Sequence, residues 1–160
     1  MELISKSVND TKSIGKVIAK HLKAADIICL FGELGSGKTM LAKGIAMGLK
    51  IKESKVISPT FVLIREHYKG ILPFYHFDLY RLKNECEIAA IGYEEYLYDD
   101  GVSVIEWADR LKSLMPRYFL KIELIFKPGS LRKIKFSASG LRYKELLSKI
   151  NEDISRRYHH

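Results

Sequence analysis

The eight-residue segment GELGSGKT, residues 32–39, constrains the fold of this chain more than any other feature. It follows the short apolar run DIICLF, which is typical of a buried strand, and it precedes TMLAKGIAMGL, which we expect to be a helix. Strand, glycine-rich turn and helix in this order form the first half of a βαβ unit. The segment therefore predicts an α/β fold.

The residue types in this segment suit the binding of a nucleotide. Gly32, Gly37, Lys38 and Thr39 match the pattern G-x-x-x-x-G-K-[ST]. Glycines let backbone N–H groups approach an anion closely, and the following helix directs its positive N-terminus to the same place. Lys38 adds a charge that can reach the β- and γ-phosphates, and the Thr39 hydroxyl can bind Mg²⁺.

The remaining sequence predicts a single domain over residues 1–160, built as a P-loop NTPase-like α/β fold. We expect a central, mostly parallel sheet with antiparallel hairpin strands and with helices on both faces. The expected hairpins join VISPTFVLIREHY to GILPFYHFDLY through Lys69-Gly70, and YFLKIELIF to LRKIKFSA through KPGS. VSVIEW is a further buried strand, and helices are expected after a cap at Asp10 or Thr11 and near the C-terminus.

Composition narrows the function classes only slightly. The formal net charge is +8, which suits nucleic acid, a nucleotide or an acidic protein partner, but the lysines are scattered, as on a solvated surface. No RNA-reading signature such as an RRM or KH motif is present. Cys29 and Cys86 form no CxxC or Cys/His cluster, and no apolar run approaches the ~20 residues of a membrane span. With no signal-peptide pattern at the N-terminus, we expect a cytoplasmic protein.

A phosphate-binding loop needs an acid to hold magnesium, usually at the end of a neighbouring apolar strand. Asp78 ends the run ILPFYHFD, and Glu106 ends the run VSVIE. Each acid directly follows several apolar or aromatic residues, so a functional role is favoured over that of an ordinary surface carboxylate. Asp109 lies in a polar context and is expected to be a surface residue.

Four further residues have two interpretations each. Trp107 can pack in the core, which is commoner for a lone tryptophan, or lie beside the nucleotide. Arg81 can face phosphate or form an ion pair, and His76, which shares a strand face with Asp78, can be catalytic or simply buried. Thr60, in SPTF, can sense a γ-phosphate as in small GTPases or belong to a polar turn.

Taken in order, GELGSGKT, SPTF, HFDLYRL, GYEEY and VIEWADR resemble the motif series of the TsaE family. These are small bacterial P-loop ATPases that serve synthesis of N6-threonylcarbamoyladenosine in tRNA. The resemblance runs from about residue 11 to residue 110. It implies a weak, partner-stimulated ATPase that uses ATP and Mg²⁺. It also implies partnership with the threonylcarbamoyl transferase TsaD and its companion TsaB, with tRNA reached through that complex.

The resemblance also assigns roles to individual residues. Thr39 and Glu106 resemble the magnesium-holding pair of the family. Asp78 resembles its catalytic carboxylate near the γ-phosphate, and Lys38 is expected to act with Asp78 in catalysis. Thr60 would belong to a switch-like segment, and Thr11 matches a position close to the nucleobase. Nucleotide contacts are implied for the loop and the residues that follow it, namely Glu33, Leu34, Gly35, Ser36, Gly37, Lys38, Thr39 and Met40. The family more often has alanine at Ser36 and threonine at Met40, but neither position supplies the lysine or the metal hydroxyl.

Two other functions fit the same loop. A small-molecule P-loop kinase usually needs an arginine-rich lid over the phosphates, whereas Arg65 and Arg81 are isolated in this sequence. A GTP-dependent switch needs a guanine-reading tetrapeptide such as N-K-x-D, and none is present. The accessory ATPase is therefore favoured, with the kinase as its alternative.

Overall fold

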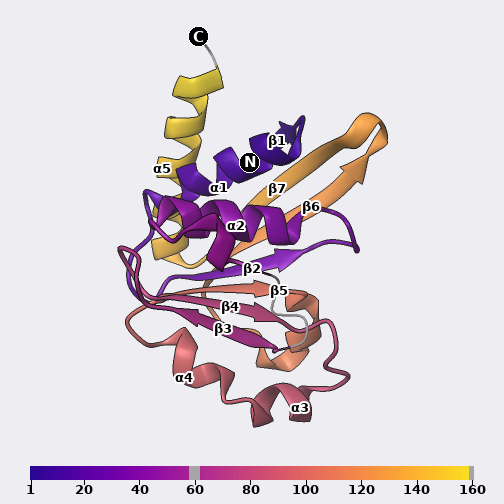
Figure 1. Cartoon of the computed structure of the whole chain (residues 1–160), viewed down its shortest axis with the longest axis vertical. Coiled ribbons are helices and arrows are strands. Elements are labelled where there is room, and N and C mark those ends of the chain that lie inside the picture. The colour runs from indigo at the N-terminus through magenta and orange to yellow at the C-terminus, as the bar shows by residue number, and fades with distance from the viewer. Residues whose placement is uncertain (58–61, 159–160) are drawn as a thin grey trace.

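A mixed sheet forms the centre of the computed structural model, which describes residues 1–57 and 62–158 (Figure 1). Its strands are β1 (Glu2–Ser5), β2 (Ile27–Phe31), β3 (Ile64–His67), β4 (Phe74–Asp78), β5 (Val102–Glu106), β6 (Phe119–Lys127) and β7 (Leu131–Ser139). The α-helices are α1 (Val8–Ala19), α2 (Lys38–Gly48), α3 (Glu85–Ala90), α4 (Tyr93–Leu97) and α5 (Leu141–Tyr158). Short 3-10 segments are η1 (Glu53–Lys55), η2 (Ala108–Leu114) and η3 (Pro128–Ser130). Thr60 and its neighbours in SPTF lie outside the described residues.

The sheet is parallel in its middle and antiparallel at its edges. Its strand order is β1-β7-β6-β2-β5-β4-β3, and β6, β2, β5 and β4 pair in parallel. The pairs β3–β4 and β6–β7 are the two expected hairpins, so the predicted fold class is confirmed. Because β2, β4 and β5 run in one direction, their carboxyl ends meet at one edge of the sheet.

The strand β1 was not foreseen. It pairs antiparallel with β7 at the sheet edge and has only four residues. Of these, only Ser5 is buried, so the segment carries no continuous apolar run or clean alternation. Its strand conformation comes from pairing with β7, a contact across more than 120 residues of chain that no local pattern encodes.

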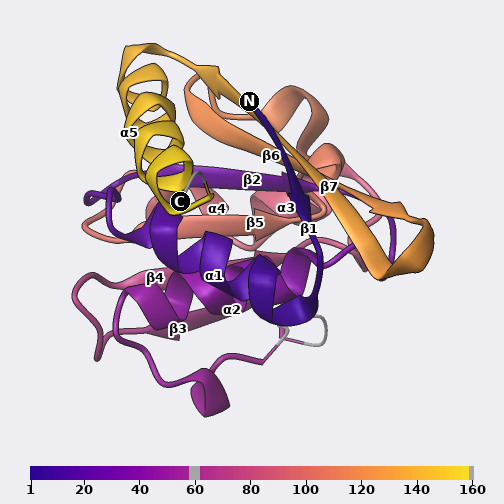
Figure 2. The same cartoon turned by 90° about the horizontal axis from the view of Figure 1, so that it is seen from above.

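Helices cover both faces of the sheet. Figures 1 and 2 show α1, α2 and α5 on one face, and Figure 1 shows α3 and α4 on the other. Strand β2 contributes to both cores, because Ile28 and Leu30 pack with the first group while Ile27 and Cys29 pack with the second. Burial on both sides explains why this strand reads as a continuous apolar run. Across residues 1–57 and 62–158, no helix combines the length and apolar character required to span a bilayer.

Helix α1 begins earlier than its sequence predicts. Its N-cap is Ser7, whose side chain accepts the Asp10 N–H at 3.0 Å, so the predicted cap at Asp10 or Thr11 was wrong. Asp10 lies in the first turn, where its carboxylate accepts the Lys6 N–H at 2.9 Å. The chain leaves β1 at Ser5, and this tertiary constraint sets the start of the helix.

Helices α1 and α2 approach closely enough to require glycine between them. A Cβ placed on Gly15 would lie 2.7 Å from both the Ile45 nitrogen and the Leu41 carbonyl oxygen. These are backbone atoms, so relief requires the two helices to separate. Close packing of α1 fixes the position of α2, whose N-terminus carries the phosphate-binding loop.

We expect Gly15→Ala to lower the free energy of unfolding by about 2 kcal/mol, because the overpacking cost exceeds the better helix propensity of alanine. Urea denaturation measures the change. Ser148→Ala in α5, at an exposed position, is the control and should stay within about 0.5 kcal/mol of the parent. An equally stable Gly15→Ala variant would show that the helix pair tolerates separation.

Candidate functional site

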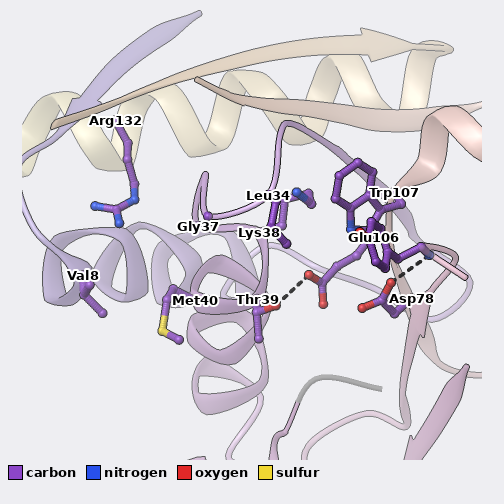
Figure 3. A pocket seen from close by; sticks show the side chains of 12 residues that line it. Val8, Leu34, Gly37, Lys38, Thr39, Met40, Asp78, Glu106, Trp107 and Arg132 are labelled. Atoms are coloured by element: carbon purple, nitrogen blue, oxygen red, sulfur yellow. Dashed lines mark hydrogen bonds between the residues drawn. The ribbon is translucent and has the colours of Figure 1, made fainter. Parts of the chain in front are cut away.

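A pocket of about 400 Å³ opens at the carboxyl ends of β2, β4 and β5, beside the N-terminus of α2 (Figure 3). The close-up shows side chains from the loop, from two strand ends and from β7 around one space. The lining residues are Val8, Leu34, Gly35, Gly37, Lys38, Thr39, Met40, Asp78, Tyr80, Glu106, Trp107 and Arg132. This is the edge at which open α/β sheets usually bind ligands.

The backbone of the loop is shaped by three glycines. Gly32, Gly35 and Gly37 have φ angles of 147°, 80° and 105°, a range that other residues rarely adopt. Gly37 is the N-cap of α2 and makes no side-chain cap hydrogen bond. The first N–H groups of α2 therefore lack the usual capping oxygen, which suits them to an anionic ligand.

Lys38 folds back over the loop. Its Nζ donates to the carbonyl oxygens of Gly32 at 2.6 Å and Glu33 at 2.9 Å. The ammonium also lies 4.2 Å from the centre of the Trp107 ring. Burial lowers the pKa of the Lys38 ammonium, although the carboxylates of Glu106 and Asp78 oppose this shift. A phosphate would offer this buried cation the full negative charge that neutral carbonyl groups do not provide.

Thr39 and Glu106 lie side by side although 67 positions separate them in sequence. The Thr39 hydroxyl donates to Glu106 Oε1 at 2.7 Å, as the dashed line in Figure 3 shows. Thr39 belongs to the first turn of α2, and Glu106 is the last residue of β5. The pairing of β5 with β2 brings the carboxylate to the loop.

Asp78 ends β4 and is the register partner of Glu106 in the parallel β4–β5 pair. Its side chain lines the pocket, and its Oδ1 accepts the Tyr80 N–H at 2.9 Å. The sheet thus brings both predicted acids to one pocket.

The same pocket contains residues whose roles sequence reasoning left open or missed. Trp107 packs against the second core cluster, as one of its two interpretations expects, and it also lines the pocket. Its contact with a nucleotide stays a prediction. Its φ of 57° marks a sharp turn directly after β5. Tyr80, Val8 and Arg132 were not predicted, and only Tyr80 had a signal, its place two residues after Asp78.

Several predicted residues do not line the pocket. Thr11 is fully buried, and its hydroxyl lies 2.7 Å from Ser5 Oγ. Ser36 is also buried, and Glu33 is exposed outside the lining. Leu34 and Gly35 in the loop and Met40 at the start of α2 do line the pocket, as the sequence predicts. Their contacts with a nucleotide stay predictions.

The oxygen atoms at this site fit a magnesium ion that arrives with a nucleotide. Mg²⁺ is usually held by one or two protein oxygens together with phosphates and water. The hydrogen-bonded Thr39 hydroxyl and Glu106 carboxylate supply two such oxygens. Within the described ranges 1–57 and 62–158, no cluster of three or more His, Cys, Asp or Glu residues could hold a metal. The donor set therefore suits a shared ion better than an all-protein metal centre.

Comparison with known proteins gives a consistent result. The family model for "Threonylcarbamoyl adenosine biosynthesis protein TsaE" matches residues 5–134. The tRNA threonylcarbamoyladenosine biosynthesis protein TsaE of Bacillus subtilis is 39% identical over 142 residues, which is 89% of this chain and 88% of the relative. The protein of the same name from Treponema pallidum is 41% identical over 124 residues, covering 78% and 90%.

A solved structure shows the same architecture. The crystal structure of YdiB from Bacillus subtilis superposes with a TM-score of 0.83 at 33% identity and covers 96% of this chain and 95% of its own. Together with the sequence matches, this shows that the chain belongs to the TsaE family.

Proposed function

We propose that this chain is an ATP-binding and ATP-hydrolysing accessory subunit for N6-threonylcarbamoyladenosine modification of tRNA. In this proposal it works in the cytoplasm with a TsaD-like transferase and a TsaB-like companion, and it meets tRNA through that complex. The observation that supports the ATPase most directly is the 2.7 Å contact between Thr39 and Glu106 beside the glycine loop. The names of the relatives support the place of this activity in tRNA modification.

In the proposed bound state, the phosphates lie against the loop and the N-terminus of α2. The Lys38 ammonium exchanges the Gly32 and Glu33 carbonyls for the β- and γ-phosphates. Thr39 and Glu106 would hold Mg²⁺, which neutralises part of the phosphate charge when bound. The Thr39 hydroxyl can keep donating its hydrogen bond to Glu106 while one of its own lone pairs faces the ion.

For hydrolysis, Asp78 orients a water molecule toward the γ-phosphate or accepts its proton. The Tyr80 N–H bond to Oδ1 restrains the plane of the carboxylate, so its acceptor oxygens face a fixed direction. Loss of the γ-phosphate would change the contacts around the pocket and loosen the partner. In this scheme the threonylcarbamoyl transfer itself belongs to the TsaD-like partner.

A small-molecule kinase is the second candidate, and one observation favours keeping it. Arg132 lines the pocket from β7, and arginines that face phosphates are common in phosphoryl-transfer sites. Arg132 lies on a strand of the β6–β7 hairpin rather than on a lid. A lone arginine on a regular strand is weaker support for a kinase than a closing, arginine-rich lid.

The proposal predicts a nucleotide response that the intrinsic tryptophan can report. Trp107 is the one tryptophan in the sequence and lines the pocket, so its emission should change when ATP and Mg²⁺ bind. We expect a weaker response to GTP, slow phosphate release by the isolated chain, and faster release when the TsaD-like and TsaB-like proteins are added. A nucleotide-dependent pull-down with both proteins tests the partnership. Transfer of the γ-phosphate to a small acceptor without partners would instead establish the kinase.

A further inference from the structure

Glu106 carries a carboxylate in a place where a negative charge is costly. The residue is 2% exposed, and a buried carboxylate is tolerated only when hydrogen bonds or opposite charges compensate for the lost water. Thr39 compensates one oxygen, Oε1. The other oxygen, Oε2, lies 2.5 Å from Nε2 of His76 on the neighbouring strand β4.

The imidazole ring of His76 is buried and has few polar contacts. The side chain is 0% exposed, and its Nδ1 has no hydrogen-bond partner among residues 1–57 and 62–158. Nε2 therefore makes the one polar contact of the ring within this part of the chain, and that contact is with Glu106. Since an ionised carboxylate only accepts hydrogen bonds, Nε2 carries a hydrogen and donates a hydrogen bond to Oε2.

Glu106 is thus held from two sides by different elements. Thr39 approaches from the first turn of α2, and His76 approaches from β4. Two donors on the two oxygens of one carboxylate restrain its rotation about the last side-chain bond. With His76 alone removed, Oε2 would lose its donor and the carboxylate could turn away from Thr39.

We infer that His76 is a positioning residue for the magnesium site, because its hydrogen bond to Oε2 keeps Oε1 of Glu106 directed at Thr39 and the shared ion. This inference rests on the proposed function, since it needs a Mg²⁺–nucleotide complex at Thr39 and Glu106. Outer partners that orient a metal-holding side chain typically contribute 10–100-fold to metal affinity. His76 is not among the residues that line the pocket, so it would supply this orientation without a contact of its own to the nucleotide.

The test compares ATP affinity in excess Mg²⁺ with ATP affinity in EDTA, both measured by calorimetry. We expect His76→Met to lower the ratio of these two affinities by about tenfold while affinity in EDTA stays unchanged. His76→Gln, whose amide can present a donor near the position of Nε2, should keep most of the ratio. His76→Asn should lose it, because its shorter amide reaches only the region of Nδ1.

The control is His67→Met on β3, because the structure records no contact between His67 and Glu106. This variant should leave the ratio of ATP affinities with and without Mg²⁺ unchanged. A wild-type ratio in His76→Met, or equal ratios in the Gln and Asn variants, would overturn the inference. If His76→Met fails to fold in a thermal melt, the Gln and Asn pair decides alone. A wild-type chain whose ATP affinity is indifferent to Mg²⁺ would instead contradict the proposed function.

Discussion

Replacement of Lys38 with alanine is expected to abolish ATP binding, with a loss of affinity of at least about 100-fold. The Lys38 side chain is only 5% exposed, and its ammonium is held between two loop carbonyls and the Trp107 ring. A charge-assisted contact with phosphate in such a water-poor place is stronger than one on the surface. Alanine removes the charge and leaves the phosphates facing a polar but neutral loop.

The loss should not come from unfolding. Burial lowers the pKa of Lys38 in the folded protein below its value in the unfolded chain, so keeping the group charged near neutral pH costs folding free energy. The free energy of unfolding therefore rises as the pH rises from the lowered pKa of folded Lys38 toward the pKa of the unfolded chain. Below that range Lys38 is charged in both states, and Lys38→Ala removes the free-energy cost of burying its charge. We expect the variant to unfold at a temperature no lower than the parent.

Calorimetric titration with ATP and Mg²⁺ measures the affinity of the Lys38→Ala variant. Lys43→Ala is the matched control, because Lys43 lies on the same helix α2 but not in the pocket lining. The control should bind ATP within about threefold of the parent, a difference under 1 kcal/mol. An unchanged affinity in Lys38→Ala would remove the nucleotide-binding role proposed for the loop.

Replacement of Asp78 with asparagine is expected to preserve ATP binding and to lower partner-stimulated hydrolysis by about 10²–10³-fold. Asparagine has the same shape and can still accept the Tyr80 N–H through its Oδ1, so the pocket keeps its form. It has no negative charge with which to orient or deprotonate the attacking water. The two measured quantities should therefore separate, with affinity retained and turnover lost.

Phosphate release with the TsaD-like and TsaB-like proteins present, at saturating ATP, measures this effect. Asp109→Asn is the control, since Asp109 is an exposed carboxylate three residues after Glu106 and does not line the pocket. It should hydrolyse ATP at close to the parental rate. Full stimulated hydrolysis by Asp78→Asn would rule out the role proposed for Asp78.

The features that the sequence predicted well are local ones. The strand, the glycine loop and the start of α2 lie within residues 27–48, where the residue types themselves set backbone conformation and hydrogen bonding. The acids Asp78 and Glu106 could also be singled out, because each ends a buried run. Ends of parallel strands meet at one edge of a sheet, so their meeting in one pocket followed from the fold class.

The features that the sequence did not predict depend on contacts between distant segments. The cap at Ser7 and the strand β1 follow from pairing with β7, and Arg132 reaches the pocket because β7 lies beside the loop. The hydroxyl of Thr11 lies against Ser5, a contact that the end of β1 makes possible. Each of these outcomes is set by how elements pack in space, which neither periodicity nor composition encodes.

The chemical groups of the site follow from the residues of the chain: a glycine-lined loop with Lys38 and Thr39, and two acids at strand ends. The contacts among those groups, including the one between Glu106 and His76, depend on how the strands pack. The order β2-β5-β4 brings Glu106 to Thr39 on one side and to His76 on the other, and so determines which buried donors compensate its charge. Local sequence specifies conformation over a few residues, whereas neighbours across a sheet are selected by burial of the whole chain.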